Sequence, residues 1–357
     1  MAKRSREEPQ HAASFDKDTA MAYQHRAQGI ANEEQSMLRI TKEGPENPDT
    51  KEFCGAFAAI NMDNSWDSAD FRRGFSIQMR SMSEEVVEFD MIGIDPPLVN
   101  AFRRILIAEV PTIAISRVTI SQNTGALQDE NLAHRLGLVP ISTEPNDLKW
   151  KGKDHDFTEE NSIKFVLKTS CDDAQGKLSV YSRDLQWVPL GPQQAAFYKD
   201  HPPRPVVDDI LITQLRSSGE VECECLCEKG IGQEHAKWSP VCTASYRLMP
   251  VLRHSKSSED EDALDLHKIR PKSIFDVEEG SSISRELIKS PGSCSTSRRE
   301  GLPVASENGG LIFSKAKDHF IFTIESVGQV PAPLLFERAL EKLKDKCEIA
   351  KARLERK

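Results

Sequence analysis

Residues 331–357 read PAPLLFERALEKLKDKCEIAKARLERK and form the clearest element of the chain. Apolar residues recur there at spacings of 4, 3, 4, 3 and 4, at Phe336, Leu340, Leu343, Cys347, Ala350 and Leu354. This heptad spacing predicts a long helix that packs along one stripe. About 22 residues with a rise of 1.5 Å each make a rod of about 33 Å. The helix could pack along its own domain, as surface helices usually do, or its far end could meet a partner chain.

Strands and a second helix are expected upstream of this rod. Phe320, Phe322 and Ile324 alternate along a strand that ends at Gly328, and apolar alternation over 75–94 predicts a strand pair. Asp95-Pro96-Pro97 then opens a helix that Pro111 stops. Its apolar stripe contains Leu98, Val99, Phe102, Ile105 and Leu106.

The middle of the chain is predicted to be mainly β. A strand over 113–120 precedes a short helix that Asp129 caps and Gly137 closes. Short apolar runs between turn residues then predict strands over 163–169, 177–183, 210–215 and 220–227.

Two polar regions interrupt this order. Residues 1–65 are expected to form a mobile tail, with a short helix around Ser36–Lys42. Residues 251–310 are rich in Ser, Glu, Asp and Gly, and are expected to form an irregular acidic surface excursion.

Charge and composition exclude several classes of function. The 357 residues contain 47 Lys and Arg against 56 Asp and Glu, a net charge of −9, which disfavours autonomous binding to nucleic acid. No run reaches the roughly 18 apolar residues of a membrane span, and no secretory signal is present. The eight cysteines are therefore expected to be reduced thiols inside the cell.

The sequence contains residue types that could form a metal site or an active site. Cys223, Cys225 and Cys227, with Cys242 and His235 nearby, are metal-ligand types, but alternate residues on a strand lie about 6.5–7 Å apart, too far for one tetrahedral zinc ion. Small apolar side chains on a buried strand face are the preferred interpretation. No nucleophile elbow, phosphate loop or metalloprotease motif is present, and His134 is expected to be partly buried.

Four ordered blocks carry a family resemblance. Residues 100–112 read NAFRRILIAEVPT, residues 133–140 AHRLGLVP, residues 230–241 GIGQEHAKWSPV and residues 322–328 FTIESVG. In these blocks the chain resembles the α-like subunits of multisubunit RNA polymerases, a superfamily that includes the bacterial α subunit and its archaeal counterpart. It looks most like the larger α-like subunit shared by RNA polymerases I and III, because the zinc-binding cysteine loop of the polymerase II form is missing between Pro140 and Cys223.

The resemblance implies an α+β fold of two domains. A discontinuous dimerisation domain would take residues 75–118, 243–250 and 311–357, and an inserted, mostly β domain would take residues 119–242. The two helices would pack against a smaller α-like subunit through Leu98, Phe102, Ile105, Phe336, Leu340, Leu343, Cys347, Ala350 and Leu354. The side facing the second-largest subunit would carry Arg103, Arg104, His235, Lys237 and Trp238.

The resemblance also implies a function without catalysis. The expected role is that of an assembly subunit in the nucleus and nucleolus, with no active site, cofactor or metal, contacting other small polymerase subunits and touching DNA only through the complex. The rivals are the same scaffold in RNA polymerase II, a metal or iron–sulfur module on the four cysteines, and a coiled-coil homodimer.

Overall fold

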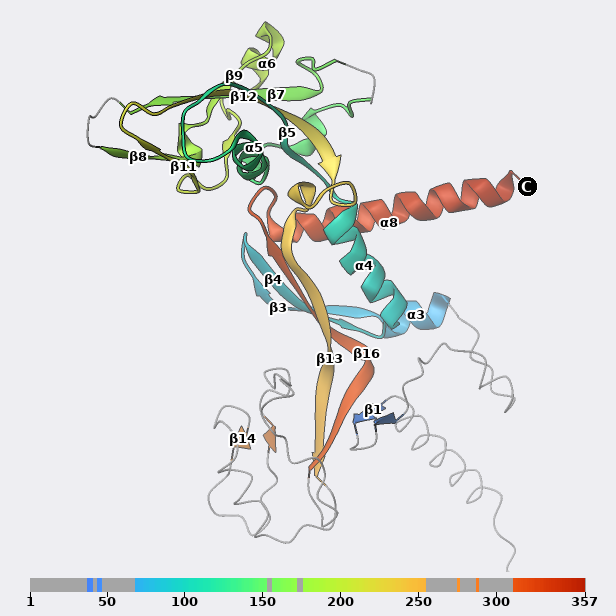
Figure 1. The fold of residues 1–357 in the computed structure, drawn as a ribbon. Coiled ribbons are helices and arrows are strands. Elements are labelled where there is room, and N and C mark those ends of the chain that lie inside the picture. The colour runs from blue at the N-terminus through green and yellow to red at the C-terminus, as the bar shows by residue number, and fades with distance from the viewer. Residues whose placement is uncertain are drawn as a thin grey trace, which may run out of the picture. The chain divides into compact units, whose positions relative to one another are not determined.

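The computed structural model divides the chain into two compact units, residues 1–67 with 248–318, and residues 68–247 with 319–357. It describes residues 37–40, 44–46, 68–152, 156–171, 176–254, 275–276, 287–288 and 311–356. Figure 1 shows both units as ribbons. Most of the expected acidic excursion and of the N-terminal tail lies outside the described residues.

The first unit contains short strands near the N-terminus. Strand β1 (Met37–Ile40) pairs with β2 (Pro45–Glu46) and with the start of β16 (Leu311–Ser326). The helix expected around Ser36–Lys42 is therefore wrong, because the tertiary pairing of Met37 with Ala316 overrides local helix propensity. Strands β14 (Phe275–Asp276) and β15 (Leu287–Ile288) form a separate pair.

The second unit contains an antiparallel sheet covered by two helices. Strand β3 (Ser76–Met82) pairs with β4 (Val86–Ile92), and β4 pairs with residues 319–325 of β16. Strand β16 also pairs with β13 (Val241–His254), and residues 311–318 of β16 and 248–254 of β13 belong to the first unit. Helices α4 (Pro96–Ala108) and α8 (Ala332–Glu355) contact one another, and a short helix α3 (Ser68–Gly74) precedes β3 (Figure 1). The predicted strand pair, both helices and the final strand are confirmed.

The core of this sheet is apolar on the face that meets the helices. Phe320, Phe322 and Ile324 of β16 lie opposite Met91, Phe89 and Val87 of β4, and all six side chains are buried. The rings of Phe89 and Phe322 stack with centroids 5.5 Å apart. Alternate apolar residues of two strands thus form one buried face, as the sequence predicts.

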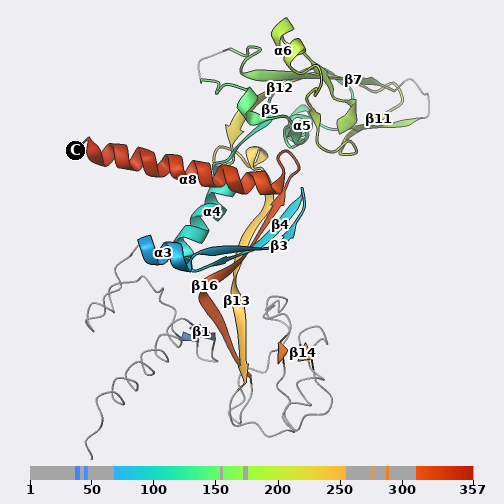
Figure 2. The same ribbon diagram turned by 180° about the vertical axis from the view of Figure 1, so that it is seen from behind.

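A second sheet holds the β-rich part of the same unit. Its order is β5 (Pro111–Asn123), β12 (Glu220–Ile231), β7 (Ser162–Ser170) and β9 (Gln186–Val188). Helix α5 (Asp129–Gly137) packs on β5 with Leu132 and Leu136 fully buried (Figure 2). Asp129 and Gly137 lie inside this helix and do not cap it, since Gln128 and Leu138 take the cap positions.

Smaller elements complete the β-rich part. Strand β8 (Lys177–Tyr181) pairs with β11 (Leu211–Arg216), and β6 (Ile141–Ser142) pairs with β10 (Arg204–Pro205). Short helices are α6 (Pro192–Phe197), η1 (Pro145–Asp147), η2 (Ser182–Asp184) and η3 (Ala236–Trp238). The α+β class is confirmed. None of the described helices is long and apolar enough to cross a membrane.

Candidate subunit-binding surfaces

Helix α8 divides into a covered half and an uncovered half. Ala332, Leu335 and Ala339 are fully buried, and the Phe336 ring lies 4.8 Å from that of Phe89 and 5.5 Å from that of Phe102. After Leu343, every described residue of the helix is exposed. Figures 1 and 2 show this end extending beyond the other elements of its unit.

The predicted heptad stripe is only partly used by the chain itself. Phe336 and Leu343 are half-buried, whereas Leu340 is 42% exposed and Leu354 is 74% exposed. Cys347 and Ala350 are exposed as well. An apolar stripe therefore continues past the surface that this unit can cover, as expected of a helix that needs a partner.

The predicted stripe of α4 faces mainly inward. Phe102 and Ile105 are 6% and 2% exposed, so both side chains pack inside the chain and are not available at its surface. Leu98 is 38% exposed. Of the three α4 residues expected at a partner interface, only Leu98 lies at the surface.

An exposed apolar face on β3 escaped sequence reasoning. Ile77, Met79 and Met82 are 44%, 55% and 64% exposed. They lie directly opposite Met91, Phe89 and Val87 of β4, and cross-strand partners share a face of the sheet. The face that carries α8 thus continues uncovered across β3, which we call the β3 face.

A second candidate surface lies where α4 meets the loop after β12. Gln233 N donates to the Ala108 carbonyl oxygen at 2.9 Å. A Cβ on Gly232 would lie 2.2 Å from the Ile107 carbonyl oxygen, so only glycine allows this approach. The glycines of the GIG motif thereby bring the segment with His235 and Lys237 to the end of α4.

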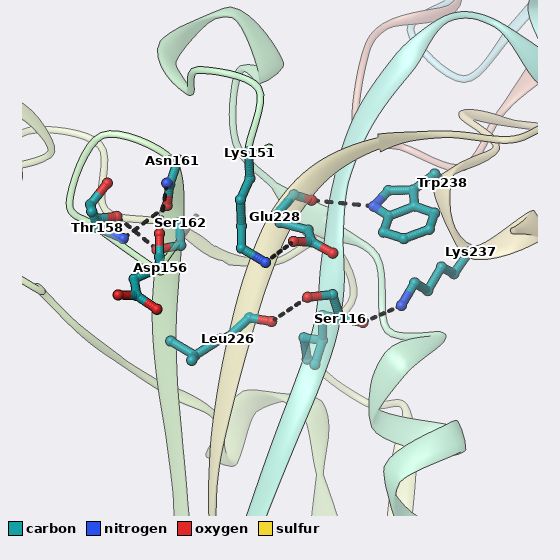
Figure 3. Close-up of polar contacts among 11 residues, drawn as sticks. Ser116, Lys151, Asp156, Thr158, Asn161, Ser162, Leu226, Glu228, Lys237 and Trp238 are labelled. Atoms are coloured by element: carbon teal, nitrogen blue, oxygen red, sulfur yellow. Dashed lines mark hydrogen bonds and ion pairs between the residues drawn. The ribbon is translucent and has the colours of Figure 1, made fainter. Parts of the chain in front are cut away.

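Trp238 anchors this segment from the inside. Trp238 is 7% exposed, and its Nε1 donates to the Glu228 carbonyl oxygen at 3.2 Å (Figure 3). Thr112 Oγ1 donates to the carbonyl oxygen of Trp238 at 2.7 Å. A Cβ on Gly230 would lie 2.4 Å from the indole ring. The indole therefore packs inside this chain, whereas Trp238 was expected at the surface that faces the second-largest subunit.

Lys237 and His235, the polar residues beside Trp238, differ in exposure. Lys237 Nζ donates to the Ile115 carbonyl oxygen at 2.9 Å and lies 4.3 Å from the indole ring (Figure 3). Burial lowers the pKa of this ammonium group. His235 is exposed, and its Nδ1 accepts from Lys237 N at 3.1 Å. Lys237 thus holds the segment in place, and His235 faces solvent.

Arg103 and Arg104 point away from the buried stripe of α4, as predicted. Arg103 is half-buried, and its Nε and Nη2 donate to Asn100 Oδ1 at 3.0 and 2.9 Å. Arg104 is exposed. Arg104 precedes Ala108 by one helical turn, so it lies on the α4 segment to which Gln233 is bonded. We call Arg103, Arg104 and His235 the α4 arginine surface.

The cysteines of β12 belong to the core. Cys223, Cys225 and Cys227 are all 0% exposed and pack in a cluster of buried apolar side chains. Burial raises the pKa of the Cys227 thiol. The interpretation as small apolar core residues is confirmed. The described residues contain no group of three or more His, Cys, Asp and Glu arranged to hold a metal ion.

One histidine was placed wrongly by sequence reasoning. His134 is exposed on the surface of α5, and the partly buried position expected for it is wrong. The helix buries Leu132 and Leu136, which turns the histidine between them toward solvent.

Comparison with known proteins defines the class. Residues 88–347 match the family of the RNA polymerase Rpb3/Rpb11 dimerisation domain. Because this match covers more than half of the chain, the chain belongs to that family. The resemblance to α-like polymerase subunits is confirmed.

Relatives narrow the class further. The chain is 39% identical over 318 residues to the RNA polymerases I and III subunit rpac1 of Dictyostelium discoideum, covering 87% of this chain and 91% of that one. It is 36% identical to the human subunit RPAC1 of the same polymerases, covering 90% and 96%. A subunit 3 of RNA polymerases II, IV and V from Arabidopsis thaliana is 32% identical, covering 79% and 92%. Similarity is therefore greater to the I and III form.

Proposed function

We propose that this chain is a non-catalytic assembly subunit of nuclear RNA polymerases I and III. The observation that carries the proposal is the apolar stripe of α8, which continues over Leu340, Cys347 and Leu354 beyond the surface of its own unit. Relatives named as subunits of polymerases I and III are 35–39% identical, against 32% for the polymerase II, IV and V relative, which favours the I and III assignment over polymerase II.

The partner on this stripe is the smaller α-like subunit. Its interface takes Leu98 and the α8 residues Leu340, Leu343, Cys347, Ala350 and Leu354, and it extends onto the β3 face. Phe102, Ile105 and Phe336 support these residues from beneath. The proposed dimerisation domain consists of residues 75–118, 243–250 and 311–357, with residues 119–242 as the inserted β domain.

The α4 arginine surface is proposed to dock the second-largest subunit. Arginine suits such a surface because its planar, permanently charged group forms several hydrogen bonds at once. Lys237 and Trp238 contribute by fixing the segment that carries His235. Ribonucleotide polymerisation then takes place elsewhere in the complex, without an active site or cofactor in this chain, in the nucleolus for polymerase I.

Co-expression with a smaller α-like subunit followed by size exclusion tests the central claim. The two chains should elute together as a 1:1 complex. A stable monomer that ignores the second chain, or a discrete homodimer, would contradict the proposal. A tagged chain should also retain the largest subunits of polymerases I and III, and recovery of the polymerase II subunit alone would favour the rival scaffold.

Mutations should affect the two proposed binding surfaces independently. Arg103→Ala with Arg104→Ala should leave the heterodimer intact, because neither side chain lies on the α8 stripe. The same double variant should weaken capture of the second-largest subunit by about tenfold, the usual scale for loss of interface arginines. Equal capture by the variant and the unaltered chain would remove the α4 arginine surface from the proposal.

A further inference from the structure

Helix α8 has a row of residues that points toward its own unit, beside the apolar stripe. Leu335 and Ala339 are fully buried on this row. Lys346 follows Ala339 by seven residues, or about two turns, so it lies on the same side of the helix. We call Leu335, Ala339 and Lys346 the inward row. It continues past the covered half of α8, where its apolar residues give way to a lysine.

Lys346 forms the last polar contact between α8 and the rest of its unit. Its Nζ donates to Glu109 Oε1 at 2.7 Å, and the two side chains are 49% and 24% exposed. The ion pairs of Lys344 and Lys351 stay within α8. Of residues 344–356, Lys346 is the only one whose side chain the structure shows bonded to another described element.

Glu109 projects from a backbone that is fixed on both sides. It caps the C-terminus of α4, and its N–H donates to the Ile105 carbonyl oxygen at 2.9 Å. The N–H of Val110 donates to the same oxygen at 3.2 Å, and the Val110 side chain is fully buried. Figures 1 and 2 show this end of α4 lying against α8, with which it is in contact. The ion pair therefore connects the uncovered half of α8 to a rigid point of the unit.

A small tilt of α8 would move its apolar stripe a long way. The helix rises about 22 Å from Ala339, its last fully buried residue, to Leu354. A tilt of about 10° at Ala339 would displace Leu354 by about 4 Å. Backbones in preformed interfaces shift by only about 1 Å on binding. A contact that restrains this tilt would therefore prepare the stripe for a partner and improve affinity.

We propose that Lys346 is a positioning residue, and that its ion pair with Glu109 fixes the direction of the uncovered half of α8. Lys346 lies beside the apolar stripe and acts through the helix that carries it. The consequence for partner binding rests on the proposed function, because it requires the smaller α-like subunit on the stripe. The direction of the helix is tested on this chain alone.

Double electron–electron resonance on the full chain measures this direction. Spin labels carried by non-natural amino acids replace Arg104 of α4 and Ala352 of α8, both of which are exposed. The unaltered pair should give a narrow distance distribution. Lys346→Glu sets two carboxylates against each other, so it should broaden or shift the distribution. Combining it with Glu109→Lys restores an ion pair of reversed polarity and should restore the distribution.

Arg353→Glu is the matched control for Lys346→Glu. Arg353 follows Lys346 by seven residues on the same side of α8, is exposed, and forms no ion pair with another described residue. The change in net charge is the same, but the distance distribution should stay as in the unaltered chain. An unchanged distribution for Lys346→Glu, an equal change for Arg353→Glu, or no restoration by the charge swap would overturn the proposal.

Affinity for the smaller α-like subunit tests the consequence. Lys346→Glu should weaken binding about fivefold, and the charge-swapped chain should bind within about twofold of the unaltered chain. The effect of Lys346→Glu should shrink in about 0.5 M salt, because salt screens partly exposed charges. Weakened binding that the swap does not restore would assign Lys346 to direct contact with the partner and overturn the positioning role. If the unaltered chain fails to bind the smaller subunit, the proposed function fails, while the spin-label distances still decide the role of Lys346.

Discussion

Individual residues, the glycines Gly230 and Gly232 and the carboxylate of Asp90, have large effects on the packing and stability of the second unit. Gly230 and Gly232 are needed because an indole ring and a backbone carbonyl occupy the space of their missing Cβ atoms. The sequence shows the GIG motif but not what it contacts, since Trp238 and Ile107 approach it only after folding. The sequence therefore indicated that residues 230–238 form a functional segment. Tertiary contacts, which the sequence does not show, determine which side chains of this segment face solvent.

Gly230→Ala should destabilise the chain by overpacking. The added methyl group would lie 2.4 Å from the Trp238 ring, which two hydrogen bonds hold in place through its Nε1 and its carbonyl oxygen. The free energy of unfolding should fall by about 1–3 kcal/mol. Gly74→Ala is the control, because a Cβ there would have no atom within 4 Å. Chemical denaturation of both variants measures the difference, and equal midpoints would contradict the packing argument.

Asp90 should make the free energy of unfolding depend on pH in the acidic range. It accepts hydrogen bonds from Arg80 Nε at 2.5 Å and Nη2 at 3.0 Å, and His319 Nε2 lies 3.2 Å from its Oδ2. Burial raises the pKa of Asp90, but these donors outweigh burial and hold the pKa below its ordinary value of 3.8. A lowered carboxyl pKa gives stability that is fully present above pH 3.8 and is lost as the pH falls below it.

Asp90→Asn measures this contribution. The variant should lose about 1–3 kcal/mol of unfolding free energy at neutral pH, because Arg80 loses its buried carboxylate. The difference from the unaltered chain should shrink below the ordinary aspartate pKa, where Asp90 becomes protonated. Glu88→Gln, whose carboxylate lies 3.8 Å from Arg247 in a half-exposed pair, should change stability by less than about 0.5 kcal/mol. A constant difference from pH 7 to pH 3 would count against the role of Asp90.

At the scale of elements, periodicity predicted what local sequence controls. The apolar spacing of α8, α4 and α5 and the alternation in β4 and β16 are properties of short segments, and these elements were predicted correctly. Strand β1 was missed because its partner lies more than 270 residues away in the sequence. The β3 face was missed because alternation shows which residues share a face but not whether anything covers it.

The uncovered half of α8 should contribute most of the binding free energy of the proposed heterodimer. Leu354→Asp places a charge on the apolar stripe, and co-elution with the smaller α-like subunit should weaken tenfold or more. The thermal unfolding midpoint of the Leu354→Asp variant alone should stay unchanged, since the Leu354 side chain is 74% exposed in the single chain. Ala352→Asp is the matched control, because two residues of rotation place it on the opposite side of the helix. Loss of co-elution by both variants alike would show that helix charge, not the stripe, is responsible.

At the scale of the second unit, α8 is tied to the β-rich part by polar contacts. Arg338 binds Glu144, and Gln329 Nε2 donates to the carbonyl oxygens of Ile113 at 2.9 Å and Ile141 at 3.3 Å. These contacts join residues far apart in sequence, so no local pattern predicted them. They lie within one compact unit, which holds both α8 and the β-rich part.

A double-mutant cycle should reveal the Arg338–Glu144 contact. Arg338 is 13% exposed, so Arg338→Met and Glu144→Gln should show a coupling of about 1 kcal/mol in the free energy of unfolding. The exposed pair Lys344 and Glu348 on the same helix should show a coupling near zero, because solvent screens it. Denaturation of the four chains of each cycle gives both values, and equal couplings would contradict a structural role for Arg338.

The uncovered half of α8 has a consequence for the abundance of this protein in the cell. Newly synthesised copies in excess of the partner chain would expose the apolar stripe of α8 to solvent. Chaperones bind exposed apolar surfaces of this kind, and proteases degrade chains that keep them exposed. Depleting the companion should then shorten the lifetime of this chain, so that supply of one governs the amount of the other. Equal amounts of this chain and its partner would then result from degradation of copies whose α8 stripe stays exposed, without a dedicated sensor.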